Sequence, residues 1–227
     1  MTNSKSKKVK TRVNVSNILG ASHKANWVYR MAELLIFLRV RRYPHILMLS
    51  EFQKPQQELF RQKADRYNFV AGTSDGVAWR KDTYKRKKSG SYRINYLGGH
   101  HMVPYVLLEH IKTGKKIWVF PMHLPPTMQG YDRGDRLAAA AIMKSRIETK
   151  LKEVKAPLLL GGDTNDHDWD DWLRRNLPDS EIGVYDTRRK IDWLSGIGVE
   201  WVSTDVIWNG RVQLISDHSI LRATIKF

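Results

Sequence analysis

The stretch Leu158–Asp166, which reads LLLGGDTND, constrains the fold of this chain more than any other segment. Three consecutive leucines are typical of a strand that is buried on both faces. The two glycines that follow allow the backbone to turn without a Cβ in the way. Asp163, Asn165 and Asp166 come next, so the strand is predicted to end in a cluster of carboxylate and amide groups.

These polar groups suit two different roles. A carboxylate and an amide two residues apart can hold a metal ion or orient a water molecule, and can hydrogen-bond a phosphoryl oxygen. Asp and Asn are also ordinary turn residues, so an inert polar turn explains the stretch equally well when it is taken alone. The choice depends on whether other strands end in the same way.

Charge and composition narrow the class of protein. The 227 residues carry a net charge of +16, which favours a polyanionic partner, nucleic acid before an acidic membrane surface, with a general compositional bias as the alternative. The absence of Cys excludes disulfides, thiolate zinc sites and a cysteine nucleophile. No apolar run reaches the ~18–20 residues of a membrane span, and no apolar region follows the basic N-terminus. We therefore expect a soluble, intracellular (cytoplasmic) protein.

Hydrophobic periodicity predicts strands and helices along one domain, residues 12–227, preceded by a basic flexible arm, residues 1–11. Helices are expected at about 25–42, 55–67 and 133–154, with a short one near 169–173. Strands are expected at 12–18, 45–51, 77–79, 103–111, 116–122, from 157, at 190–194, 202–208, 211–215 and 220–227. Asn209-Gly210 is a strong hairpin signal, so 202–208 and 211–215 are predicted to pair.

The segment 80–93, RKDTYKRKKSGSYR, is dense in Lys and Arg and contains a single Asp. It is predicted to form an exposed hairpin or loop, and it is the strongest local candidate for a contact with nucleic acid. A solvated charged loop without a partner is the alternative. The residues assigned to nucleic-acid binding in this segment are Arg80, Lys81, Lys85, Arg86, Lys87, Lys88 and Arg93.

Polar groups stand at the ends of six predicted strands or in the loops that follow them. If the strands lie in packed sheets with these ends on one edge, four carboxylates, two amides and two imidazoles converge around one space. A lone histidine after a strand is usually structural, but six such coincidences in one chain favour a site. The groups are Asn17, Glu51, His123, Asp163 with Asn165, Asp192, and Asp217 with His218.

The motifs that carry these groups are VNVSNILG, ILMLSEFQ, WVFPMHLPP, LLLGGDTND, KIDWL and ISDHSIL. In this order they resemble the endonuclease/exonuclease/phosphatase superfamily, which has the deoxyribonuclease-I-like fold, from about residue 12 to the C-terminus. The resemblance implies an α/β (α+β) four-layered sandwich, in which two mainly antiparallel sheets pack together and helices flank them. It also implies hydrolysis of a phosphoester bond that depends on Mg²⁺, with Mn²⁺ as the other candidate.

The resemblance also implies a metal site. Glu51 would be the principal metal ligand, with Asn17 and Asp217 beside it. These are oxygen donors, which Mg²⁺ prefers.

Five further residues take catalytic roles by the same resemblance. Asp163 would orient the attacking water. Asn165 and His123 would hold the phosphoryl oxygens. His218, positioned by Asp192, would act as acid/base or stabilise the transition state, and a His–Asp pair near neutral pKa suits that task.

The chain departs from the family pattern at three points. Thr164 stands where the family usually has Phe, a packing position. The nucleases pair the first histidine with a second glutamate, where this chain offers Thr73 or Asp75. Near the strand HMVPYVLL the family often places Arg or Tyr against the phosphate, where this chain has Met102. There His100, His101 or Tyr105 would have to substitute, and His101 joins the predicted nucleic-acid contacts.

The leading hypothesis is a metal-dependent nuclease that acts on DNA, with RNA as a further substrate, by metal-assisted attack of water. A phosphatase or phosphodiesterase for lipid, inositol phosphate or a nucleotide is the first alternative, because the same core site serves all of these. A nucleic-acid-binding protein that uses the fold without catalysis is the second. The oligomeric state is left open, with a monomer favoured.

Overall fold

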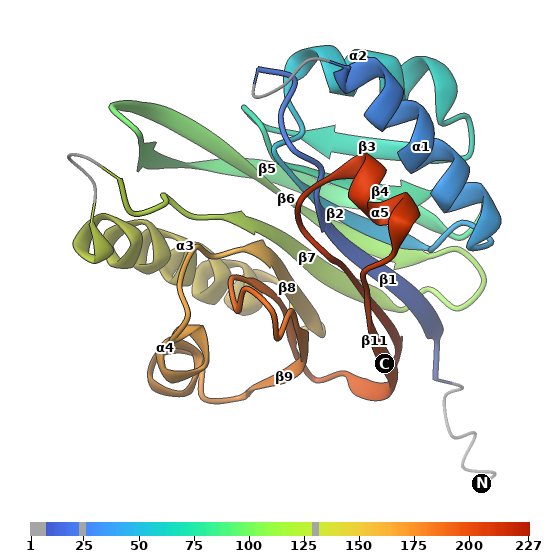
Figure 1. Cartoon of the computed structure of the whole chain (residues 1–227). Helices are drawn as coiled ribbons and strands as arrows, with labels where there is room; N and C mark the ends of the chain where they lie inside the picture. The colour runs from blue at the N-terminus through green and yellow to red at the C-terminus, as the bar shows by residue number, and fades with distance from the viewer. Residues whose placement is uncertain (1–7, 23–25, 129–131) are drawn as a thin grey trace, which may run out of the picture.

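Two six-stranded mixed sheets pack face to face, and helices cover the outer face of each sheet (Figure 1). The computed structural model describes residues 8–22, 26–128 and 132–227. The pairs β1–β2 and β7–β8 are parallel and the other pairs are antiparallel. The four-layered α/β sandwich predicted from the sequence is confirmed.

The first sheet carries α1 (Trp27–Val40), α2 (Lys54–Lys63) and α5 (Gly210–Ile215) on its outer face. Its strands, in spatial order, are β11 (Glu200–Ile207), β12 (Ile220–Lys226), β1 (Lys10–Asn17), β2 (Ile46–Ser50), β4 (Gly76–Arg80) and β3 (Tyr67–Ala71). The β1 strand already includes Lys10 and Thr11, which the sequence placed in the arm. Residues 1–7 of that arm, and Lys24 and Ala25 of the predicted first helix, lie outside the described residues.

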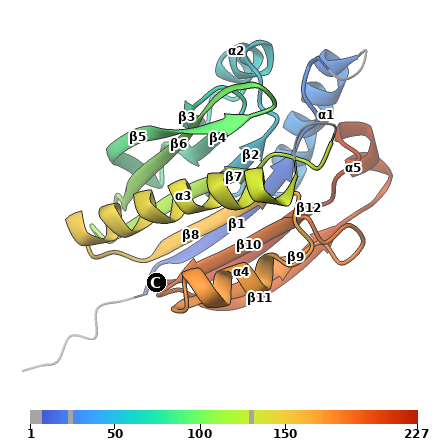
Figure 2. The ribbon, with the colours of Figure 1, turned by 90° about the vertical axis from the view of Figure 1, so that its left-hand side faces the viewer.

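The second sheet carries α3 (Arg133–Glu153) and α4 (Trp169–Asn176), and Figure 2 shows α3 lying across its outer face. Its strands, in spatial order, are β5 (Tyr84–Tyr96), β6 (Gly99–His110), β7 (Lys116–His123), β8 (Leu158–Asp163), β10 (Asp192–Ile197) and β9 (Ser180–Tyr185).

The leucine run of β8 is buried on both faces, as its composition predicts. Leu159 belongs to the apolar layer between the sheets, whereas Leu158 and Leu160 belong to the layer beneath α3 and α4. All three side chains are almost fully buried, so the strand is fixed in the centre of the molecule. The polar residues that end it are therefore held on a rigid element.

The prediction of a hairpin at Asn209-Gly210 is wrong. Residues 210–215 form the helix α5, and β11 pairs directly with β12. The side chain of Asn209 accepts hydrogen bonds from the backbone N–H groups of Arg211 and Val212 and so caps the helix. Asn is a preferred N-cap residue as well as a preferred hairpin residue, and in this chain Asn209 acts as the N-cap.

Other boundaries also differ from the sequence-based expectation. The helix predicted to run to Tyr67 ends at Lys63, and Tyr67 begins the unpredicted edge strand β3. The strand β9 is likewise unpredicted. The expectation of an exposed hairpin for the basic segment is confirmed in part, because most of the segment lies in the 13-residue strand β5, which forms a long antiparallel hairpin with β6. Within the described ranges, no helix is long and apolar enough to cross a membrane.

Candidate active site

The register of the sheets brings the predicted polar groups to one edge. Asn17 pairs with Ser50, the residue before Glu51, at the ends of the parallel strands β1 and β2. In the other sheet, Asp163 at the end of β8 pairs with both His123 and Asp192. The two sheets are packed together, so these ends face a common space.

Asn17 joins the two sheets through hydrogen bonds to two carboxylates. Its amide nitrogen donates to Glu51 Oε1 at 2.8 Å and to Asp163 Oδ2 at 3.1 Å. Glu51 Oε2 accepts from the backbone N–H of Gly20 at 2.8 Å. Glu51 itself has φ 57°, a sparsely populated conformation that non-glycine residues adopt mostly where the surroundings require it.

Asp163 and Asn165 are fixed by the turn that follows β8. The backbone N–H of Asn165 donates to Asp163 Oδ1 at 2.9 Å, and the Asn165 side chain donates to the carbonyl oxygen of Leu124 at 2.9 Å. Asp166 is the third polar residue of the stretch. Its side chain accepts a hydrogen bond from the backbone N–H of Asp168, and its Oδ2 lies 3.7 Å from Arg133 Nε. Asp166 therefore stabilises the turn that holds Asp163 and Asn165.

A buried triad of Asp163, His218 and Asp192 forms the second part of the site. His218 Nδ1 is 2.7 Å from Asp192 Oδ2, and its Nε2 is 3.8 Å from Asp163 Oδ2. Burial would lower the pKa of His218, but the charge of Asp192 and the hydrogen bond to it outweigh burial and raise the pKa to about 9. Burial, and then the charge of Asp192, raises the pKa of Asp163 to about 7.

The partner of His123, which the sequence left open, is the fully buried Asp75. Asp75 Oδ1 lies 3.7 Å from His123 Nδ1, and Asp75 Oδ2 lies 3.6 Å from His101 Nε2. Burial, together with the charges of Asp163 and Glu51, raises the pKa of Asp75 well above its ordinary value. Thr73, the other candidate, instead hydrogen-bonds the backbone of Met102.

Tyr96, which the sequence analysis missed, contacts His123 on its other side. Its hydroxyl lies 2.9 Å from His123 Nε2. Burial raises the pKa of Tyr96, so the hydroxyl keeps its proton. Tyr105, proposed for this place, stacks on Phe120 in the layer beneath α3. Tyr96 could have been found only from the full length of β5, because it is the last residue of that strand.

Asp217, predicted as a metal ligand, is half-exposed at the rim of the site. Its carboxylate accepts a hydrogen bond from Arg189 at 3.1 Å. Burial would raise the pKa of Asp217, but the nearby charges of His218 and Arg189 lower it.

The donor set of this site fits a hard divalent cation. Glu51 and Asp163 supply carboxylate oxygen atoms, which Mg²⁺ and Mn²⁺ favour, and the Asn17 side-chain oxygen accepts from the backbone N–H of Leu19. A second group of possible ligands is formed by Asp163, Asp192 and His218. Each of these residues offers one donor atom, and the three atoms lie within 4.8 Å of one another. Burial, and then the charges of Asp163 and Glu51, raise the pKa of Asp75, and a divalent cation would relieve the repulsion among these three carboxylates.

The residues predicted to bind nucleic acid are divided between two places. Arg93 pairs with Met102, towards the end of the sheet where Tyr96 contacts His123. His101 is buried and accepts hydrogen bonds from Ser74. Lys85 pairs with Glu109, which pairs with Lys116, the first residue of β7. His123 is the last residue of β7, seven residues away, or roughly 23 Å along the strand. The remaining residues, Arg80, Lys81, Arg86, Lys87 and Lys88, belong to this distant group.

Comparison with known proteins identifies the family. The model of the Endonuclease/Exonuclease/phosphatase family matches residues 14–218, so the chain belongs to this family of phosphoester hydrolases. No curated protein sequence gives a significant match. The fold itself is shared with many solved structures of low sequence identity.

Three of these structures illustrate the range of the fold. The human Nocturnin catalytic domain with bound sulfate is 18% identical, with a TM-score of 0.76 and coverage of 96% of this chain and 97% of that one. D. rerio TDP2 complexed with a single-strand DNA product is 17% identical, with a TM-score of 0.75 and coverage of 95% and 98%. The mannosyl-6-phosphatase of Bacteroides thetaiotaomicron is 13% identical, with a TM-score of 0.78 and coverage of 96% and 100%.

Proposed function

We propose that this protein is a Mg²⁺-dependent phosphodiesterase that hydrolyses nucleic acid, DNA in preference to RNA. The observation that carries the proposal is the connected set Glu51–Asn17–Asp163–His218–Asp192, in which hydrogen bonds and one ion pair at 3.8 Å join carboxylates, an amide and a charged imidazole around one buried space. Mn²⁺ is the second candidate for the metal.

The residues divide the chemistry of hydrolysis between them. Glu51 and Asn17, with Asp217 at the rim, would hold the metal ion, which when bound withdraws charge from the phosphoryl oxygens. Asp163, whose pKa is raised to about 7, orients the attacking water and can accept its proton near neutral pH. His218 is cationic below its pKa of about 9 and stabilises the negative charge that develops on the phosphoryl group.

His123 and Asn165 would hold the phosphoryl oxygens in position. His123 is oriented from both sides, by Tyr96 and by Asp75. Asn165 is held by the carbonyl oxygen of Leu124 and by the turn around Asp163. Groups fixed in this way need little reorganisation when the substrate binds, which favours catalysis.

Net charge supports nucleic acid as the substrate. A chain with a charge of +16 attracts polyanions strongly, and such binding weakens steeply as salt concentration rises. The structural neighbour TDP2, which was solved with a single-strand DNA product, shows that this fold accommodates such a chain in that protein.

The test is incubation of the purified protein with supercoiled plasmid in Mg²⁺, in Mn²⁺ and in EDTA, beside an Asp163→Ala control. We expect nicking that requires the metal and is lost in the control. Intact plasmid throughout would overturn the DNA assignment and lead to the same test on RNA.

A phosphatase of small phosphoesters is the second candidate, and the similarity to the mannosyl-6-phosphatase favours it. Release of inorganic phosphate from sugar, nucleotide, inositol or lipid phosphates, with plasmid left intact, would establish it. Specific nucleic-acid binding that survives Glu51→Ala, with no hydrolysis of any phosphoester, would instead indicate a binding protein.

A further inference from the structure

A groove of about 580 Å³ lies between the edge strands of the two sheets, β3 and β5, at the end away from the catalytic residues. Its walls come from the start of β3, the end of β4, the start of β5 and the helix α2. It therefore lies beside part of the basic segment that the catalytic site does not use.

Positive charge dominates this groove. Arg61, Lys81, Lys85 and Arg86 line it, and none of the described lining residues carries a carboxylate. The side chains of Lys81 and Arg86 are exposed and make no hydrogen bond or ion pair with any other described residue. Lys85 is paired with Glu109 at 2.9 Å. Two cations are thus available to a ligand without the loss of an internal contact.

Aromatic rings form the apolar part of the same groove. Tyr67, Phe69, Trp79 and Tyr84 line it; Tyr67, Trp79 and Tyr84 are buried, and Phe69 is the partly exposed ring. The Arg61 guanidinium lies over the Phe69 ring, 5.3 Å from its centre. The Trp79 side chain is 3% exposed, and its indole nitrogen has no hydrogen-bond partner among the described residues. Phe69, with the Arg61 guanidinium over it, is therefore the part of the apolar wall that a base can reach, and the cations can contact the phosphates of a single strand.

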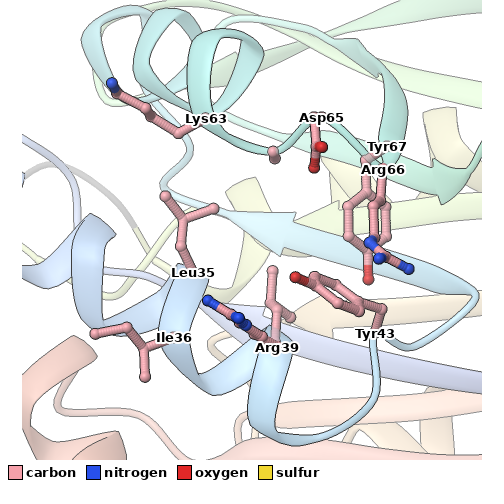
Figure 3. Close-up of a pocket in the computed structure, with 10 residues that line it drawn as sticks. Leu35, Ile36, Arg39, Tyr43, Lys63, Asp65, Arg66 and Tyr67 are labelled. Carbon is pink, nitrogen blue, oxygen red and sulfur yellow. The ribbon is translucent and has the colours of Figure 1, made fainter.

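A neighbouring cavity has a different character. It holds about 220 Å³ between α1 and the α2–β3 connection and shares Tyr67 with the groove (Figure 3). Asp65 is among its lining residues, and the Arg66 guanidinium lies over the Tyr43 ring at 4.7 Å. Its one carboxylate and its partly engaged cations make it less suited to a polyanion than the groove.

We propose that the groove between β3 and β5 binds a segment of single-stranded nucleic acid, apart from the catalytic site. Its volume lies within the range of ligand pockets and suits on the order of one or two nucleotides, whereas a duplex would touch only its rim. The strand β5 continues from the groove to Tyr96 at the catalytic end, so a bound strand has a path along one sheet edge. Nucleic acid is chosen as the polyanion on the strength of the proposed function.

The test measures binding without cleavage. A short fluorescein-labelled oligothymidylate is titrated with the protein in EDTA, and fluorescence anisotropy gives the Kd over a range of salt concentrations. The variant Lys81→Ala/Arg86→Ala should bind about tenfold more weakly, and its log–log salt slope should be smaller by about 1.4, since each lost phosphate contact on a single strand removes about 0.7.

The matched control is Arg174→Ala/Arg175→Ala. It removes the same net charge from α4, which contacts β9 at the opposite edge of the second sheet. This control should change the Kd less than twofold. If both variants bound oligothymidylate equally weakly, overall charge would explain the effect and the proposal would be overturned. An unchanged Kd in the groove variant would also overturn it. Circular dichroism establishes that both variants are folded.

Two further arms separate this proposal from the proposed function. A hairpin duplex DNA should lose less affinity than the single strand in the groove variant, and an equal loss would contradict the single-strand assignment. Hydrolysis of bis(p-nitrophenyl) phosphate, which is too small to reach the groove, should be unchanged in that variant. If no phosphoester is cleaved but the oligothymidylate still binds through the groove, only the proposed function fails.

Discussion

Two buried histidine–aspartate arrangements lie in the same site and differ in their electrostatics. In the first, His218 Nδ1 lies 2.7 Å from Asp192 and the pKa of His218 is raised to about 9. In the second, His101 Nε2 lies 3.6 Å from Asp75 and burial lowers the pKa of His101 to about 4. Both imidazoles are almost equally inaccessible to solvent, so burial alone does not separate them.

The charge of Asp192, together with the hydrogen bond to it, makes the difference. Burial disfavours a charged imidazole in both places, and only a carboxylate in hydrogen-bond contact compensates for it. His101 Nε2 instead accepts the backbone N–H of Ser74 at 3.1 Å, which requires an unprotonated nitrogen. The first arrangement therefore holds a cation, which the proposed mechanism uses to stabilise the phosphoryl group, and the second holds a neutral imidazole next to His123.

Removal of the cation should have the largest effect. His218→Ala is expected to lower kcat by about 10³-fold, because it removes both the charge and the acid/base group. Steady-state kinetics on the substrate identified in the plasmid experiment would measure it. A folded variant with kcat within tenfold of the wild type would show that His218 does not take part in the reaction.

Weakening of the first pair should have the next largest effect. Asp192→Asn keeps the shape of the partner but removes its charge, so the pKa of His218 should fall. We expect kcat to drop by about 10²-fold and the alkaline limb of the pH–rate profile to move to lower pH. His218→Ala provides the reference, and a lower kcat with an unmoved limb would assign the limb to another group.

The metal-free protein should lose stability as pH rises through the range set by these groups. Asp163 has its pKa raised from 3.8 to about 7, so its contribution is fully present below pH 3.8 and is lost as pH rises through 7. The contribution of His218 is present below pH 6.5 and is lost as pH rises through 9. In EDTA, we expect the contribution of these groups to fall by about 6 kcal/mol from pH 5 to pH 9, since each pKa unit is worth about 1.4 kcal/mol, and Tm to fall by at least about 12 °C.

The control for this experiment is Asp163→Asn. In this variant, Tm should fall less between pH 4 and pH 7 than in the wild type. Calorimetry in matched buffers would measure both proteins. Added Mg²⁺ should raise Tm most at the alkaline end, because a cation binds the ionised carboxylates. If Tm fell with pH by the same amount in the wild type and in Asp163→Asn, the raised pKa of Asp163 would be contradicted.

Tyr96→Phe should have a moderate effect, confined to the side of the site that contains His123. Loss of the hydroxyl removes one hydrogen bond to His123, worth about 1 kcal/mol, so kcat/KM should fall about fivefold. His218 should titrate as in the wild type. A change in the His218 pKa would show that the two sides of the site are coupled more strongly than the structure indicates.

Ser74→Ala should have the smallest effect on activity. It removes the Ser74 hydroxyl that lies 2.8 Å from His101 Nε2, but the backbone N–H of Ser74 remains in place. Unfolding free energy should fall by about 1 kcal/mol, as denaturant titration would show, with kcat changed less than twofold. A loss of activity comparable to that of His218→Ala would give the second arrangement a catalytic role.

The fold and the core of the site could be predicted because the strand ends carry their own signals. The leucine run of β8 and the polar residues at Asp163 and Asn165 are local features of one segment. Asp75 and Tyr96 could not be assigned in the same way, because their positions depend on the Ser74 turn and on the full register of β5 against β6.

The remaining errors have similar physical causes. Asn209 fits a hairpin and a helix N-cap equally well, and the choice depends on the pairing of β11 with β12. The charge of the basic segment is visible in the sequence, but its position is not. The long strand β5 carries Lys85 to the end of the sheet opposite His123, and only the register shows this.

The most direct test of the account is an NMR titration of the imidazole groups in ¹⁵N-labelled, metal-free protein, with signals assigned by His218→Gln and His101→Gln. We predict that His218 is protonated at neutral pH and titrates near 9, while His101 stays neutral down to about pH 4. Titration of both histidines near 6.5 would contradict the division of the site into a charged pair and a neutral imidazole.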